Sequence, residues 1–135
     1  MSDNDTVESG GADTQDTQDT SETLFERIIA REIPADIVYE TDTTLAFRDI
    51  APQAATHVLV VPKVRYRTVA ELAAADPALL ADVVATAAKV AEQEGLDSGY
   101  RLVFNTGADA GQTVFHVHAH VLGGEQLGQF GRSSQ

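Results

Sequence analysis

Apolar residues at helical spacing begin directly after residue 23. Thr23 and Glu26 form a T-x-x-E capping box, which marks a helix start, and the spacing continues as far as Pro34. The apolar positions that share this spacing are Leu24, Phe25, Ile28 and Ile29. The pattern predicts a short amphipathic helix between Thr23 and Pro34.

A longer apolar stripe lies in the middle of the chain. Asp76 and Pro77 suit the N-cap and the first position of a helix, and Gly95 lies where that helix would end. The stripe consists of Leu79, Leu80, Val83, Val84, Ala87 and Val90. A helix of about five turns is predicted.

Five segments rich in β-branched and apolar residues have the pattern of strands. They are IVYE (37–40), TLAFRD (44–49), THVLVVP (56–62), YRLVFNTG (100–107) and TVFHVHAHVLGG (113–124). The order is helix, three strands, long helix and two strands, with short connections between neighbouring strands. This order predicts an α+β fold, in which helices pack on one face of an antiparallel sheet.

Length, composition and charge indicate one domain with an acidic tail. The chain has 135 residues, of which 43% are hydrophobic, enough for one core. The net charge is −12, and the first 22 residues hold seven acidic residues but no Lys or Arg. We expect residues 1–21 to be disordered, because they lack the apolar side chains that a fold needs, and 22–135 to form the domain.

The remaining composition narrows the functional classes. Two Lys stand beside seven Arg, and such an acidic, Lys-poor chain is typical of a high-salt cytosol, although an ordinary acidic protein has the same signature. The absence of Cys excludes disulfides, thiolate nucleophiles and cysteine metal sites. With no secretion signal, membrane-length apolar run or basic patch, we expect a soluble cytoplasmic protein without membrane or nucleic-acid partners.

Three of the four histidines lie within five residues, in FHVHAHVLGG (115–124). Side chains alternate between the faces of a strand, so we expect His116, His118 and His120 on one face and the intervening Val and Ala residues on the other. Such a row permits a metal site, a proton-handling site, a nucleophilic site or polar positions that face solvent.

Geometry weighs against one metal ion bound by all three histidines. Residues 116 and 120 of a strand have Cα atoms about 13 Å apart, whereas zinc binds nitrogens at about 2.1 Å. A site with two of them and His57 remains open.

Nucleophilic catalysis fits better, because a neutral imidazole has one lone pair, whose availability depends on the partner of its other ring nitrogen. The nearby loop GADAGQT could present backbone N–H groups to an anion, which favours phosphorus as the electrophile.

Beyond these inferences, the sequence resembles the histidine-triad (HIT) superfamily. Its signature is H-x-H-x-H followed by two apolar or glycine positions, and HVHAHVLGG is similar to the HINT branch. The likeness extends from LFERIIAREIPADIVYE through TLAFRDIAPQAATHVLVVPK to the histidine segment.

The resemblance implies a fold, an assembly and an activity. The fold is a five-stranded antiparallel sheet with two helices, and two chains form a homodimer with a ten-stranded sheet. The implied reaction is hydrolysis of purine nucleoside 5'-phosphoramidates, in which an amine is joined to the α-phosphate, through a covalent nucleotidyl-histidine. The implied partner is a purine nucleotide, with no cofactor and no metal ion.

The resemblance also assigns roles to individual residues. His118 matches the nucleophile, His120 the neighbour that fixes its ring, and His116 and His57 histidines that support the same site. Asp49 matches a carboxylate that accepts hydrogen bonds from the ribose hydroxyls. The matched phosphate positions are Asn105, Gly111 and Thr113, and the matched lining of base and sugar is Leu24, Phe25, Ile28, Ile33, Phe47, Ile50 and Leu59.

The sequence also departs from the family pattern. Thr113 stands where the family usually has Ser, Arg48 replaces a His of close relatives, and the tail EQLGQFGRSSQ lacks the tryptophan and paired prolines of eukaryotic members. Two alternative functions stay open. One is cleavage of dinucleoside polyphosphates such as Ap3A or Ap4A, which HVLGG disfavours, and the other is a purine-nucleotide-binding regulatory dimer with incidental turnover.

Overall fold

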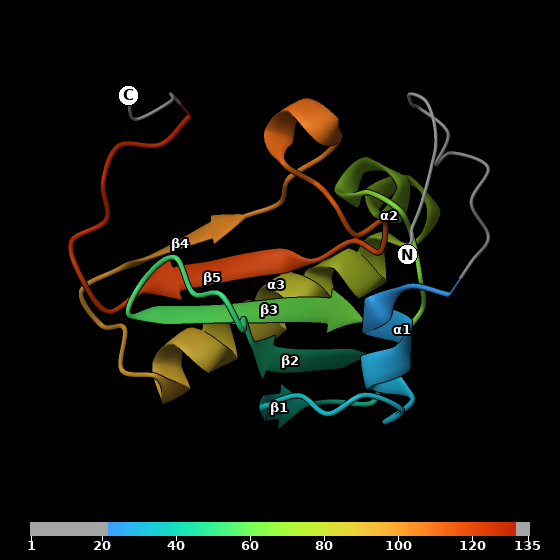
Figure 1. The fold of residues 1–135 in the computed structure, drawn as a ribbon, viewed down its shortest axis with the longest axis horizontal. Helices are drawn as coiled ribbons and strands as arrows, with labels where there is room; N and C mark the ends of the chain where they lie inside the picture. Colours follow the sequence, from blue (N-terminus) through green and yellow to red (C-terminus); the bar gives the residue numbers. More distant parts are fainter. Residues whose placement is uncertain (1–21, 132–135) are drawn as a thin grey trace.

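The computed structural model describes residues 22–131, which form a five-stranded antiparallel sheet with helices packed against it (Figure 1). The helices are α1 (Leu24–Ile29), α2 (Val69–Ala75) and α3 (Pro77–Gln93), with a 3-10 turn η2 (Ala108–Ala110). The strands are β1 (Ile37–Glu40), β2 (Thr44–Arg48), β3 (Thr56–Pro62), β4 (Tyr100–Val103) and β5 (Ala119–Gly123). Their order in the sheet is β1-β2-β3-β5-β4, so β3 is central and β1 and β4 form the edges.

The central strand β3 contributes to two separate cores. Val58 and Val60 belong to the core under α3, whereas Leu59 and Val61 belong to a second core under α1. This division follows from the alternation of side chains along a strand. Burial on both faces explains why the segment is an almost continuous run of apolar residues.

The larger core lies between the sheet and α3. The Asp76 side chain accepts a 3.1 Å hydrogen bond from the Leu79 backbone and Pro77 takes the first helical position, which confirms the predicted helix start. The hydroxyl groups of Thr44 and Thr86, both buried, share a 2.8 Å hydrogen bond that joins β2 to α3. The apolar side chains that α3 buries are Leu79, Val83, Ala87, Val90 and Ala91.

The smaller core holds α1 against the other side of the sheet. Both hydrogen bonds of the predicted capping box are present, from Thr23 N–H to Glu26 Oε1 at 2.8 Å and from Glu26 N–H to Thr23 Oγ1 at 3.1 Å. Phe25 and Ile28 of α1 pack with Leu45, Phe47, Leu59 and Val61. The prediction that all helices pack on one face is therefore wrong for α1, because its apolar residues meet strand side chains that point away from α3.

The predicted fold class is confirmed, and three elements differ from the prediction. Helix α2 was not predicted, because Leu72 is its only buried residue and its seven residues are too few for an apolar stripe. The predicted strands over 100–107 and 113–124 are too long, since β4 ends at Val103 and β5 begins only at Ala119. The chain before Ala119 hydrogen-bonds to the connection after β3 instead of to a neighbouring strand.

The expected acidic tail over 1–21 lies outside the described residues, so its structure stays a prediction. Between residues 22 and 131, no helix has the length and apolar character needed to cross a membrane.

Candidate active site

The segment that carries His116 and His118 is held by the connection between β3 and α2. Val117 donates its backbone N–H to the carbonyl of Tyr66 at 2.7 Å, and Arg65 Nε donates to the carbonyl of Phe115 at 2.9 Å. The Arg67 guanidinium lies 4.7 Å from the centre of the Phe115 ring. These contacts replace strand pairing, so the histidines before β5 are fixed although they lie outside the sheet.

His116 is fully buried and supports its neighbour through its backbone. Its Nε2 lies 2.7 Å from the carbonyl oxygen of Pro62, to which it must donate, and its Nδ1 has no hydrogen-bond partner in the described structure. Burial lowers the pKa of the imidazole, and the hydrogen bond to Pro62 partly offsets this. The predicted alternation holds, since Val117, Ala119 and Val121 belong to the core under α3, but His116 on the other side is enclosed beside Phe25 instead of open to solvent.

His118 is held in one tautomer. Its Nδ1 lies 2.8 Å from the backbone carbonyl of His116, which can only accept, so Nδ1 carries the ring proton and Nε2 keeps a free lone pair. Burial lowers the pKa of His118, with smaller opposing effects from the His116 carbonyl and Asp49, so the ring is neutral at neutral pH. The Phe25 ring stands edge-on at 4.9 Å and limits how the imidazole can turn.

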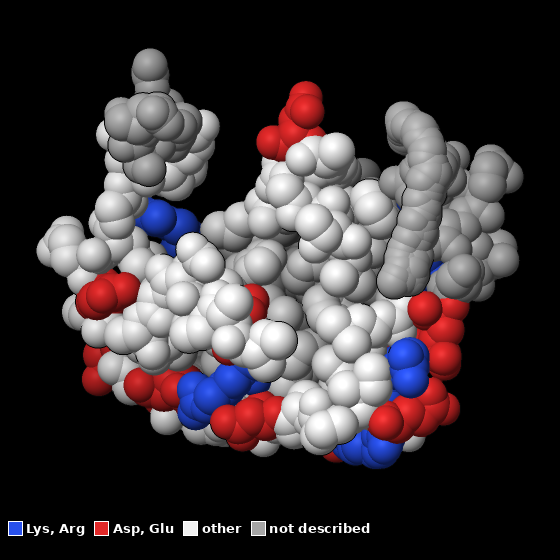
Figure 2. All heavy atoms as spheres, in the orientation of Figure 1, with Lys and Arg blue, Asp and Glu red and all other residues white. Residues whose placement is uncertain are grey.

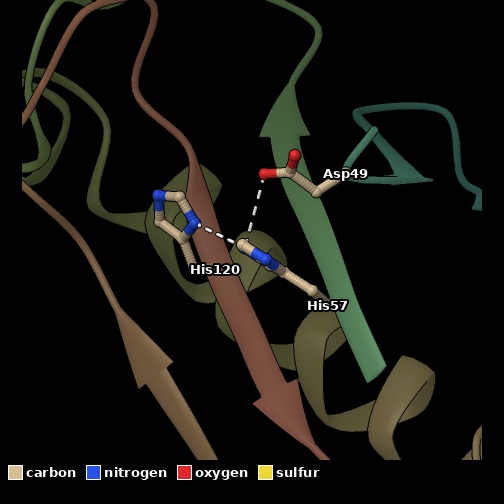
Figure 3. Close-up of side chains that lie close together, drawn as sticks. All are labelled: Asp49, His57 and His120. Atoms are coloured by element: carbon tan, nitrogen blue, oxygen red, sulfur yellow. Dashed lines mark hydrogen bonds and ion pairs between the residues drawn. The ribbon is translucent and has the colours of Figure 1, made fainter. Parts of the chain in front are cut away.

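His57 and His120 form a hydrogen-bonded pair (Figure 3). His57 Nε2 lies 2.9 Å from His120 Nδ1 and 3.5 Å from Asp49 Oδ2. The backbone N–H of Gln53 donates to His57 Nδ1 at 3.0 Å, so His57 carries its proton on Nε2. His120 therefore accepts at Nδ1 and carries its own proton on Nε2. Its ring centre lies 5.0 Å from that of His118.

The electrostatics of this cluster keep its imidazoles neutral. Burial lowers the pKa of His120 to about 4, helped by the neighbouring His118 and His57 and opposed by Asp49. Burial likewise lowers the pKa of His57, again opposed by Asp49. The cluster can thus supply one nucleophilic lone pair, on His118, and one N–H donor, on His120, at neutral pH.

Asp49, His57 and His120 are close enough for one metal ion, since their ligand atoms all lie within 4.8 Å of one another. The hydrogen bonding does not suit a metal. His57 would have to ligate through Nε2, which carries its proton, and moving that proton to Nδ1 would set it against the N–H of Gln53. A metal ion at this trio would require the loop around Gln53 to move.

The apolar residues that were expected to line a nucleotide pocket fall into two groups. Ile33 packs at the edge of the core under α1. The four that are buried in this core are Phe25, Ile28, Phe47 and Leu59. Leu24 is 47% exposed and Ile50 is 97% exposed. The exposed pair has surface free for a ligand without repacking of the core, and Ile33 keeps part of its surface exposed.

The expected phosphate positions lie on the loop between β4 and β5. Asn105 follows β4 and is half-buried, while Gly111 and Thr113 are exposed. Gly111 has φ of +87°, a left-handed conformation that favours glycine. No described contact joins these three residues to His118.

Sequence reasoning missed Gln112, which is buried within this loop. Its Oε1 accepts from the N–H of Gly107 at 2.9 Å, and its Nε2 donates to the carbonyls of Arg67 at 2.8 Å and Val114 at 3.2 Å. A buried amide with three backbone partners shapes the loop. Its position between the glycine-rich stretch and the histidines was the only signal that could have revealed it.

Arg48, one of the departures from the family pattern, forms a structural ion pair. Its guanidinium donates to both carboxylate oxygens of Glu94 at 3.0 and 2.9 Å, joining β2 to the end of α3. The hydrogen bonds to Glu94 raise the pKa of Arg48. In Figure 2 charged side chains gather along the lower edge of the face, whereas its middle is mostly uncharged.

Comparison with known proteins shows the family to which the sequence is similar. The sequence profile of the HIT domain matches residues 30–127. The purine nucleoside phosphoramidase of Escherichia coli K12 is 51% identical over 108 residues, covering 79% of this chain and 91% of that protein.

Solved structures of HIT family hydrolases have the same fold. The one from Legionella pneumophila Philadelphia 1 superposes with a TM-score of 0.75 at 48% identity, covering 78% of this chain and 95% of that one. The one from Clostridium thermocellum has a TM-score of 0.78 at 42% identity, covering 83% and 98%.

Proposed function

The chain belongs to the HIT domain family, and from this premise we propose that it hydrolyses purine nucleoside 5'-phosphoramidates with His118 as the nucleophile. The family and its relatives make the chain a nucleotide hydrolase. The observation that carries the finer proposal is the tautomer of His118, whose Nδ1–H binds the His116 carbonyl and leaves the Nε2 lone pair free.

The proposed reaction has two steps. In the first, the lone pair of His118 Nε2 forms a bond to the α-phosphorus while the P–N bond breaks, and the departing amine nitrogen takes up a proton. In the second, a water oxygen bonds to phosphorus, the bond to Nε2 breaks, and the nucleoside monophosphate leaves as water gives up a proton.

In this proposal two groups of donors would stabilise charge on the phosphoryl oxygens during both steps. His120 presents Nε2–H, and the loop that ends at Thr113 offers backbone N–H groups and a hydroxyl. All of these donors are neutral, which suits a substrate that carries a single negative charge at the reacting phosphate better than a polyphosphate chain. Thr113 keeps the hydroxyl of the usual Ser but adds a methyl group.

The ribose and the purine would bind beside this centre. Asp49 uses Oδ1 to accept the Ala51 N–H at 2.8 Å, while Oδ2 faces His57 and can still accept from ribose hydroxyls. Ile50 and Leu24 offer exposed apolar surface for the base.

We also propose a homodimer, because β4 forms one edge of the sheet and could pair with its copy to give ten strands.

A substrate panel tests this proposal. Adenosine and guanosine phosphoramidates would be compared with Ap3A and Ap4A at low and high salt, and labelled AMP trapped on the protein would be mapped by peptide sequencing. Label on His118 with phosphoramidate turnover supports the proposal. Turnover of Ap3A or Ap4A alone favours polyphosphate hydrolysis, and tight nucleotide binding without turnover favours a regulatory dimer.

A further inference from the structure

We infer that the loop between β2 and β3 (49–55) sets the ring tautomer of His57 and, through it, the position of the proton on His120. Gln53 and Glu125 become positioning residues, which act through His57 rather than on the reacting atoms. The inference rests on the proposed function only where it assigns the His120 proton to a phosphoryl oxygen.

The first step is the direction of one hydrogen bond. Gln53 offers a backbone N–H, which can only donate, 3.0 Å from Nδ1 of His57. A neutral imidazole that accepts at Nδ1 carries its proton on Nε2, which lies 2.9 Å from Nδ1 of His120. His120 must then accept at Nδ1 and hold its proton on Nε2.

The opposite tautomer would reverse the chemistry of His120. With a proton on His57 Nδ1, two N–H groups would face each other at Gln53, and the His57 Nε2 lone pair would face His120. His120 would then have to donate from Nδ1, which would turn its Nε2 into an acceptor that repels a phosphoryl oxygen. The Gln53 amide at Nδ1, together with the Asp49 carboxylate 3.5 Å from His57 Nε2, therefore decides whether His120 donates or accepts at its other nitrogen.

The loop is held in the geometry that this requires. Asp49 donates its backbone N–H to the carbonyl of His57 at 3.0 Å, which secures the start of the loop. At its far end, Ala55 donates its N–H to Glu125 Oε2 at 3.1 Å, which secures the loop to the chain just after β5. Gly124 allows this close approach, since a Cβ there would lie 3.2 Å from Cβ of Ala55.

The sharpest test removes the amide proton and leaves every catalytic side chain in place. Gln53→Pro has no backbone N–H, whereas the matched Gln53→Ala keeps it and loses only the side chain. Nitrogen-15 NMR of the histidine rings reports which nitrogen of His57 and His120 is protonated. Gln53→Ala should retain the wild-type pattern, whereas Gln53→Pro should show a mixture of His57 tautomers with part of the proton on Nδ1, with kcat lower by about twofold or more and KM changed less.

Because proline could also prevent folding, a second pair of variants tests the far end of the loop. Glu125→Ala removes the acceptor for Ala55, and Glu125→Gln keeps one. We expect faster amide hydrogen exchange at Gln53 and a mixed His57 tautomer in Glu125→Ala, and neither change in Glu125→Gln.

Two results would overturn the inference. One is a folded Gln53→Pro whose His57 and His120 keep the wild-type protonation pattern. The other is an identical pattern in Glu125→Ala and Glu125→Gln. The NMR readout needs no turnover, so it decides the inference even if no phosphoramidate is hydrolysed, and a shifted tautomer with unchanged kcat would remove its catalytic part alone.

Discussion

The backbone carbonyl of His116 lies 2.8 Å from Nδ1 of His118, so one histidine of the triad fixes the tautomer of the next through its main chain. The side chain of His116 is bound to Pro62 at the end of β3 and cannot reach outward. The two neighbours therefore have separate roles, one in holding the loop and one in the proposed attack on phosphorus.

Replacing the proposed nucleophile should separate binding from chemistry. His118→Ala removes the attacking lone pair but leaves the surrounding apolar and polar groups, so we expect kcat to fall about a thousandfold or more while nucleotide affinity changes little. Steady-state kinetics and calorimetric titration with a nucleoside monophosphate would measure the two quantities. An unchanged kcat would remove His118 from this role.

Replacing His116 should act mainly on stability. His116→Ala opens a cavity in a fully buried position and leaves the Pro62 carbonyl without its donor, so we expect the free energy of unfolding to fall by about 2–4 kcal/mol. Denaturant unfolding of both variants would show a larger loss for His116→Ala than for His118→Ala, whose side chain is only half-buried. Equal losses would contradict the division of roles.

Much of the fold could be predicted because its signals are local. The capping box at Thr23, the Asp76–Pro77 helix start and the alternation or apolar runs of the strands each depend on neighbouring residues. The extent of β5 could not be predicted, because it depends on residues about 50 positions earlier in the sequence. Tyr66 and Arg65 hydrogen-bond to the backbone of 115–117, which therefore does not pair with a neighbouring strand.

The candidate site shows the same limit. The histidines were found by their spacing, and family resemblance singled out Asp49. The backbone amide of Gln53 carries no sequence signal, and the buried side chain of Gln112 is marked only by its position in the loop. Nor could the pattern tell that His116 is enclosed while His118 and His120 are half-buried. Such distinctions depend on tertiary packing around a short irregular segment.

The neutral imidazoles should make stability depend on pH. The pKa of His120 is lowered from 6.5 to about 4 in the folded state, so the unfolded chain binds more protons between these values. The free energy of unfolding is then highest above about pH 7 and decreases as the pH falls. At pH 5, His120 alone lowers it by about 2 kcal/mol. Burial lowers the pKa of His57, His116 and His118 as well, which adds in the same direction.

Urea unfolding at several pH values between 5 and 7.5 would measure this dependence. His120→Asn provides the control, since it lacks the titrating ring and should have a shallower slope. A free energy of unfolding that stays constant over this range would show that burial does not suppress protonation of the cluster.

Metal ions should not be required for activity. His57 cannot ligate through Nε2 while the Gln53 amide holds its proton there, so a chelator should leave kcat unchanged and Zn²⁺ should bind the trio weakly. Turnover with and without EDTA, together with calorimetric Zn²⁺ titration, would test this. Tight binding of one Zn²⁺ that disappears in His57→Ala would contradict the hydrogen-bond assignment.

The loop before the histidines should be sensitive to the backbone at Gly111. This residue has φ of +87° and ψ of +17°, where a side chain costs about 1–2 kcal/mol, although a Cβ would meet no atom within 4 Å. Gly111→Ala should therefore lower the free energy of unfolding by about 1 kcal/mol through conformation alone. It should also lower kcat/KM, because the proposed phosphate donors at 111–113 would shift.

Gly128→Ala is a matched control, since its Cβ is equally unhindered and its φ is not in the left-handed region. If both variants unfold at the same denaturant concentration and keep wild-type kcat/KM, the left-handed turn has no part in binding the phosphate.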